Sequence, residues 1–139
     1  MKYVPKDKDC FVCGSDNKYG LNLDFMINEN SVSASFIPSI KYSGFKGILH
    51  GGIISSVLDD AMDWAIYAKT GFLYVTSSLN VRFIKPVYLE RELLVTGFAT
   101  DDYKESSKIQ TATAELRYKD NGELLAKSEG KFFKVPFKI

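Results

Sequence analysis

The side chains best suited to chemistry lie in one short stretch, GILHGGIISSVLDDAMDWAIY, which covers residues 47–67. It reads as a helix that begins with two glycines, Gly51 and Gly52, whose backbone N–H groups a ligand can approach closely at the positive end of the helix dipole. Further along, Asp59 and Asp63 are four residues apart, so their like charges oppose helix formation. A carbonyl oxygen polarised by glycine amides and a carboxylate that acts as base or nucleophile are the components of an acyl-transfer site.

The separation of these groups along the helix limits how they can act. At 1.5 Å per residue, Asp59 lies about 12 Å along the axis from Gly51, which is too far for both to contact one carbonyl group. The neighbouring carboxylate, Asp60, points about 100° away from Asp59 and competes with it for the catalytic role. We therefore expect the amide and the carboxylate of one site to come from two subunits, which makes a homo-oligomer a requirement.

The patterning of apolar residues indicates the elements that carry these groups. One face of the helix is apolar and is expected to pack on a sheet; its residues are Ile54, Val57, Leu58, Ala61, Ala65 and Ala68. Met62 and Trp64 lie at the margin of this face and are expected to pack at a subunit interface. Gly71 is expected to end the helix. Alternating apolar and polar residues predict strands, and the turn KDNGEL, with Asn121 and Gly122, predicts a hairpin between the last two. The expected strands cover residues 21–27, 32–36, 74–85, 92–100, 108–119 and 124–135. This order, two strands, a helix and four strands, is typical of an α+β fold.

Length and composition fit one soluble globular domain spanning residues 1–139. The chain is 45% hydrophobic and 25% charged, with a formal net charge of +1. Such a balance gives no support for binding to nucleic acid or to an anionic membrane surface. The first residues, MKYVPKDKDCFVCG, lack the apolar run of a signal peptide, and no stretch reaches the length of a membrane span. These features predict a cytoplasmic protein.

The two cysteines, Cys10 and Cys13, lie in a turn-rich N-terminal segment, residues 1–19. A structural zinc site needs four ligands, and His50, the single histidine, lies far along the chain, so the sequence offers only half of a metal site. The favoured interpretation is two reduced cysteines in a tight turn, and a redox dithiol is the alternative. No metal is expected.

The helix stretch LHGGIISSVLDDAMDWA, with CFVCGSDNKYGLNLDF before it and SSLNVRFIKPV after it, resembles the hotdog-fold acyl-CoA thioesterases. The resemblance covers nearly the whole chain and is strongest to the phenylacetate-pathway, 4-hydroxybenzoyl-CoA and mammalian superfamily members. It implies one long central helix wrapped by a curved antiparallel sheet of about five to six strands. It also implies that chains pair as dimers, or as dimers of dimers, and that both chains of a pair complete each site.

The same resemblance implies roles for individual residues. Asp59, nine residues after His50, matches the catalytic carboxylate, and Gly51 matches the residue whose N–H polarises the thioester carbonyl. Thr76 matches a hydroxyl residue that orients the carboxylate or the attacking water. Where several relatives have asparagine or glutamine, six residues before the histidine, this chain has Gly44, which leaves base and covalent mechanisms open.

Other residues are expected around the substrate. As a lone histidine beside two glycines, His50 is interpreted as a group that braces the loop rather than as a base. Cations could meet the phosphates of coenzyme A at the mouth of the site. The residues expected to contact the substrate are His50, Gly52, Asp60, Arg82 and Lys85, and the further candidate cations are Lys104 and Lys108.

The predicted function is hydrolysis of an acyl- or aryl-acyl-CoA thioester to a free acid and coenzyme A, without a cofactor. The alternative is a non-catalytic acyl-CoA binding or sensing module, which has no use for a carboxylate near the thioester. A hydratase or dehydratase is disfavoured. The motif typical of that chemistry is an aspartate followed five residues later by a histidine, and no aspartate lies five residues before His50. The acyl group, and the choice between dimer and tetramer, are left open.

Overall fold

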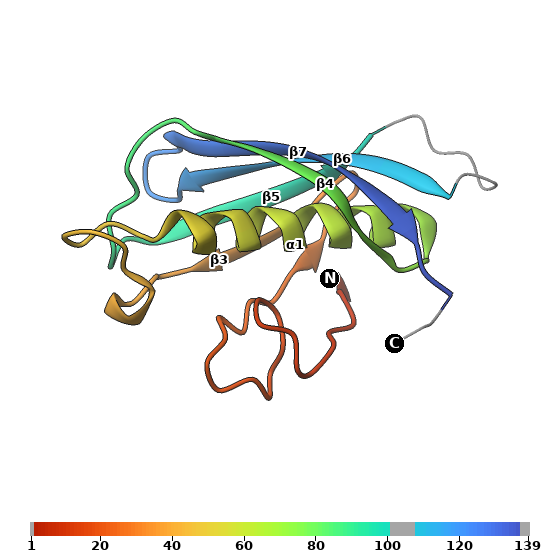
Figure 1. Ribbon diagram of the computed structural model, residues 1–139, viewed down its shortest axis with the longest axis horizontal. Helices are drawn as coiled ribbons and strands as arrows, with labels where there is room; N and C mark the ends of the chain where they lie inside the picture. The colour runs from red at the N-terminus through yellow and green to blue at the C-terminus, as the bar shows by residue number, and fades with distance from the viewer. Residues whose placement is uncertain (1, 101–107, 137–139) are drawn as a thin grey trace.

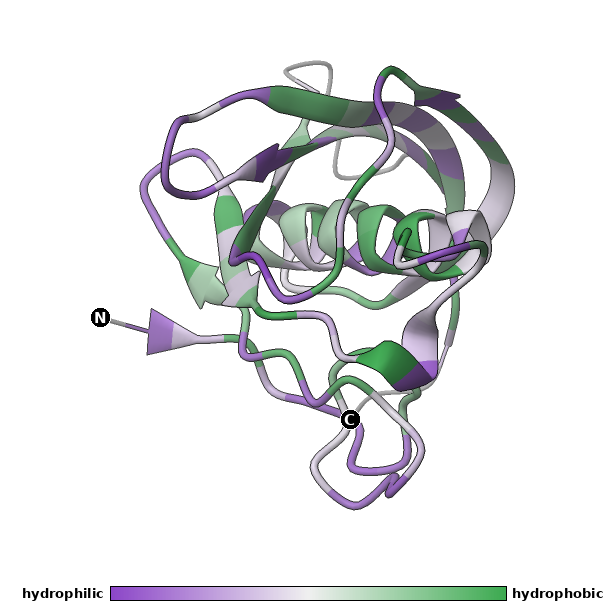
Figure 2. Cartoon of the chain, turned by 90° about the vertical axis from the view of Figure 1, so that its left-hand side faces the viewer, coloured by the Kyte–Doolittle hydropathy of each residue, from purple (hydrophilic) through white to green (hydrophobic). Residues whose placement is uncertain are grey.

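The computed structural model describes residues 2–100 and 108–136. One long helix, α1, lies along a seven-stranded antiparallel sheet that arches over it (Figures 1 and 2). The elements in chain order are β1 (Lys2–Tyr3), β2 (Met26–Ile27), β3 (Val32–Phe36), the short 3-10 helix η1 (Ile40–Tyr42), α1 (Gly51–Thr70), β4 (Tyr74–Phe83), β5 (Leu93–Ala99), β6 (Ile109–Tyr118) and β7 (Leu124–Lys134). The α+β hotdog architecture is confirmed. The expected five to six strands become seven because the two-residue strand β1 adds to the edge formed by β2 and β3.

Local side-chain and backbone chemistry sets both ends of α1. His50 is the N-cap, and its Nδ1 accepts a hydrogen bond from the N–H of Gly52 at 2.8 Å. At the other end Gly71 adopts φ 78° and donates its N–H to the carbonyl of Tyr67, as expected for a glycine that ends a helix. Within the described ranges, no helix combines the length and apolar character needed to cross a bilayer.

The core lies between α1 and the concave face of the sheet. Strands around the helix alternate between hydrophobic and hydrophilic residues (Figure 2). Met62 and Trp64, expected at the margin of the apolar face and at a subunit interface, are buried within their own chain, and Ser128 donates a hydrogen bond to the sulfur of Met62. The buried helix residues are Ile54, Val57, Leu58, Ala61, Met62, Trp64, Ala65 and Ile66. Ala68, which was placed on this face, is exposed.

The closest approach of helix to sheet occurs at Gly97 in β5. A Cβ atom at this position would lie 2.2 Å from the carbonyl oxygen of Ala61, inside van der Waals contact with backbone. We expect Gly97→Ala to destabilise the fold by about 1–3 kcal/mol, because α1 and β5 must separate to accept the methyl group. Urea unfolding followed by circular dichroism measures this. Gly44→Ala is the control, since its Cβ would meet atoms only at 3.4 Å or beyond; equal loss in the two variants would contradict the prediction.

Strand β4 forms one edge of the sheet, and among the described strands it pairs with β7 alone. Its register with β7 shifts between Thr76 and Ser78, which marks a β-bulge. Bulges commonly re-aim a side chain next to an active site. At this edge the side chains of residues 76–80 are exposed, and Leu79 keeps 39% of its surface in solvent.

The strand predicted over residues 21–27 is largely wrong, since only Met26 and Ile27 form β2. The backbone before it pairs instead with the N-terminal segment, where Leu21 and Leu23 donate their N–H groups to the carbonyls of Phe11 and Val12. The alternating pattern still reports burial, because Leu23 and Phe25 are in the core. A half-buried extended segment has the same pattern whether or not its partner is a sheet strand.

Candidate active site

Asp59 and Thr76 meet at the boundary between α1 and the edge strand β4. The hydroxyl of Thr76 donates a hydrogen bond to Asp59 Oδ1 at 2.6 Å. Burial raises the pKa of Asp59, and the hydrogen bond from Thr76 acts in the opposite direction with a smaller effect. A carboxylate that is held by one oxygen and made more basic by its surroundings is suited to accept a proton. The resemblance implied that Thr76 orients this carboxylate or the attacking water, and the structure brings the two side chains into contact.

The N-terminus of α1 presents one backbone N–H that the fold leaves available. The N–H of Gly52 is taken by the ring of His50, whereas the N–H of Gly51 meets no acceptor among the described residues. A Cβ at Gly51 would lie 3.5 Å from the ring of Phe83, so the position is open. Because Nδ1 of His50 accepts a hydrogen bond, this nitrogen carries no proton. This geometry agrees with the interpretation of His50 as a bracing group.

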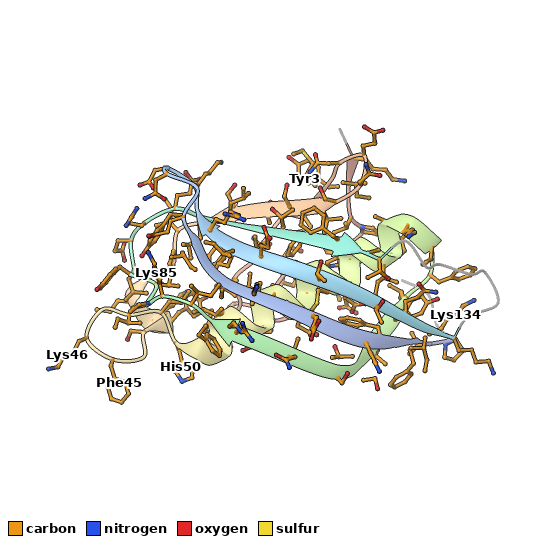
Figure 3. The ribbon with its side chains drawn as sticks, turned by 90° about the horizontal axis from the view of Figure 1, so that it is seen from above. Tyr3, Phe45, Lys46, His50, Lys85 and Lys134 are labelled. Carbon is orange, nitrogen blue, oxygen red and sulfur yellow. The ribbon has the colours of Figure 1, made fainter. Side chains whose placement is uncertain are left out.

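A shallow pocket with a volume of about 270 Å³ borders Gly51, Phe83 and Lys85. Lys85 and His50 lie at the same end of the molecule (Figure 3). The ammonium group of Lys85 forms an ion pair with Glu123 at 2.6 Å, so its charge is already partly balanced. This end of the molecule therefore holds the free amide, an exposed aromatic ring and a cation.

The structure separates other residues that were expected to share the site. Arg82 lies opposite Lys127 in the β4–β7 register and borders a hollow with Thr113 and Glu115, on the face of the sheet away from α1. Lys108 accepts a hydrogen bond from the N–H of Lys134, which lies at the far end of the molecule from His50 (Figure 3). Lys104 falls outside the described residues.

Comparison with known proteins gives the family. A family model described as the thioesterase superfamily matches residues 46–122. This chain belongs to the thioesterase superfamily. The match includes α1, β4, β5 and β6, so it covers both Gly51 and the Asp59–Thr76 pair. A search of curated proteins finds no match.

Solved structures place this superfamily member among hotdog folds. Zebrafish thioesterase superfamily member 2 superposes with a TM-score of 0.71 at 20% identity, covering 83% of each chain. The PaaI protein of the phenylacetic acid degradation operon of E. coli gives 0.74 at 18% identity, covering 86% of this chain and 83% of that one. A Streptococcus mutans protein bound to acetyl CoA gives 0.71 at 22% identity, covering 82% and 89%.

In this member of the superfamily, Asp60 faces a different environment from Asp59. Its carboxylate lies against the N-terminal segment, with Oδ1 3.8 Å from the sulfur of Cys10. Burial, with a smaller effect from the charge of Cys10, raises the pKa of Asp60 to about 7. A hydrogen bond from the thiol of Cys13 lowers the pKa of Cys10 to about 5. The same hydrogen bond, together with burial, raises the pKa of Cys13.

Asp60 and the cysteines form a cluster that the sequence did not reveal. Both cysteines are free and lie in a turn, where the N–H of Cys13 points to the sulfur of Cys10 at 3.5 Å. The helical wheel showed that Asp60 points away from Asp59, but nothing in the spacing indicates which segment it meets 50 residues away.

Proposed function

We propose that the chain is an acyl-CoA thioesterase that uses Asp59 as general base or nucleophile. The observation that carries the proposal is the hydrogen bond from Thr76 to Asp59, which fixes one carboxylate oxygen at an open sheet edge. Superfamily membership and the acetyl CoA bound to the Streptococcus mutans neighbour support the substrate class. No metal or cofactor is required for this chemistry.

In the proposed reaction, Asp59 removes a proton from water as the water oxygen attacks the thioester carbonyl. The N–H of Gly51 donates to the carbonyl oxygen as it gains negative charge. Collapse of the tetrahedral intermediate breaks the carbon–sulfur bond and releases the coenzyme A thiolate. The thiolate then takes up the proton that Asp59 removed from water. In the covalent variant the carboxylate of Asp59 attacks the thioester carbonyl, the carbon–sulfur bond breaks and coenzyme A leaves as the thiolate. Water then hydrolyses the resulting anhydride, which releases the acid and regenerates Asp59.

We infer that the Gly51 and Asp59 of one site belong to two copies of the chain. Along the edge strand β4, Gly51 lies beside Phe83 and Asp59 beside Thr76. If two β4 strands pair antiparallel about a two-fold axis between Leu79 and Asn80, Thr76 of one copy lies across from Phe83 of the other. Such pairing brings each Asp59 toward the Gly51 of the second copy, and it covers the exposed edge.

Coenzyme A is proposed to approach from the end of the molecule that holds Gly51. There the exposed ring of His50 lies at the same end as Lys85, and the ring of Phe83 borders the same pocket as Lys85. The ammonium of Lys85 would exchange its ion pair with Glu123 for a phosphate. Arg82 is less favourably placed for this role in its own chain, because it lies on the outer face of the sheet.

Release of free thiol from acetyl, medium-chain, long-chain and aromatic acyl-CoA substrates, followed with a thiol-reactive chromophore, tests the function. We expect saturable release with at least one class. Tight binding measured by calorimetry, without release from any class, would instead identify an acyl-CoA sensing module. If the protein neither binds nor cleaves any of these substrates, both functions are rejected.

A further inference from the structure

The cluster formed by Cys10, Cys13 and Asp60 lies outside the proposed thioesterase site. The N-terminal segment lies on the side of α1 that faces away from the sheet (Figure 1). It brings two sulfur atoms to one carboxylate oxygen, and these three atoms all lie within 4.8 Å of one another. Of the three pairs, Cys10 Sγ and Asp60 Oδ1 are 3.8 Å apart.

The second carboxylate oxygen of Asp60 gives independent support for a ligand. Oδ2 is buried and has no hydrogen-bond partner among the described residues. Buried carboxylates are normally hydrogen-bonded, paired with a cation or bound to a metal. Among the described residues no ion pair of Asp60 is found. A cation bound at the cluster satisfies this group.

The geometry of the cluster suits a small tetrahedral ion. With zinc–sulfur bonds of about 2.3 Å and zinc–oxygen bonds of about 2.0–2.2 Å, ligand atoms in a tetrahedron lie about 3.5–3.8 Å apart. The distance from Cys10 to Asp60 already has this value, and rotation of short side chains can close the remaining gaps. Two thiolates favour zinc over magnesium or calcium, which prefer oxygen ligands.

We propose that Cys10, Cys13 and Asp60 bind one zinc ion. A pocket with a volume of about 230 Å³ borders all three side chains, so a water molecule can supply the fourth ligand. The sequence offered only two of the four ligands that a zinc site needs, and no metal was expected from it. The fold adds a third ligand, Asp60, from the middle of α1. The ion ties the N-terminal segment to the helix, one residue from Asp59, and therefore holds that part of α1 in place.

Metal binding by the full-length protein tests the proposal. After treatment with a chelator and a thiol reductant, we expect the protein to take up one equivalent of Zn²⁺, measured by elemental analysis, and to unfold at a higher temperature with zinc. Titration with Co²⁺ is expected to give the visible bands of a tetrahedral site and a thiolate-to-cobalt charge-transfer band. Asp60→Asn keeps both cysteines and should weaken Co²⁺ binding at least about tenfold.

Matched variants separate this site from adventitious binding. Cys10→Ser should remove the charge-transfer band or weaken it, whereas Asp63→Asn, which changes a carboxylate in the same pocket but outside the cluster, should bind Co²⁺ as the native protein does. Circular dichroism confirms that each variant is folded. The proposal is overturned if the reduced native protein takes up no stoichiometric metal, or if Asp60→Asn and the native protein bind Co²⁺ equally.

Discussion

Replacement of Asp59 by asparagine is expected to lower kcat for acyl-CoA hydrolysis by about 10²- to 10⁴-fold, the usual contribution of a positioned general base. Asparagine keeps the shape of the side chain and can still accept the hydrogen bond from Thr76, so the fold should be retained. It cannot accept a proton from water or attack the thioester. The measurement is thiol release under saturating substrate, with KM determined in the same experiment.

The matched control for this variant is Asp63→Asn. Burial raises the pKa of Asp63 to about 8, with a smaller effect from the charges of Asp60 and Asp59. The side chain is therefore mostly protonated at pH 7, and asparagine replaces one neutral group with another. We expect Asp63→Asn to keep kcat within about threefold of native. Full activity of folded Asp59→Asn would reject Asp59 as the catalyst and direct attention to Asp60.

Thr76→Val separates the orientation of Asp59 from its basicity. Valine fills the same volume but cannot donate to Asp59 Oδ1, so the carboxylate loses the contact that holds it at 2.6 Å. We expect kcat to fall with little change in KM, and Thr76→Ser to restore most of the activity because serine keeps the hydroxyl. Equal loss in the serine and valine variants would indicate packing rather than hydrogen bonding.

Mixing two inactive variants is expected to restore activity if each site draws on two chains. Gly51→Leu fills the open space before the free amide, and Asp59→Asn removes the base. A mixed dimer holds one site with native glycine and native aspartate, and one site with neither. Random mixing makes half of the dimers mixed, so about one quarter of native activity should return.

The mixing experiment distinguishes a site shared between two chains from a site within one chain. If Gly51 and Asp59 of the same chain formed a site, every site in the mixture would carry a defect, and no activity would return. Co-expression with two different affinity tags allows the mixed dimer to be purified, and this species should have about half of native activity. A sedimentation experiment checks that both variants still associate, so that absence of recovery is not caused by loss of the dimer.

Local sequence chemistry was sufficient for the helix and for the last hairpin. Gly71 ends α1 and Gly122 provides the positive φ of the turn, as the sequence indicated, although Asn121 does not share that conformation. The strand over residues 21–27 was predicted too long because periodicity reports burial and not the identity of the partner. Hydrogen bonds to the N-terminal segment replaced those of a strand.

The candidate site could be predicted only where residues are linked by spacing or by resemblance. Asp59 and Gly51 lie on one helix, and resemblance associated Thr76 with Asp59. The contact of Asp60 with Cys10 joins segments 50 residues apart and depends on how the N-terminal segment folds against α1. No local pattern encodes that path. Likewise, only the register of β4 with β7 showed that Arg82 lies on the outer face of the sheet, which points away from α1.

The bare edge of β4 also bears on solubility. Its ten residues, YVTSSLNVRF, contain one charged side chain, Arg82, so that little discourages this strand from pairing with other exposed strands. Proteins usually guard such edges with lysine, proline or a covering loop. If a second copy of the chain covers this edge, a substitution that weakens pairing would both reduce hydrolysis and promote aggregation. Natural selection would then act on the two properties through the same few residues.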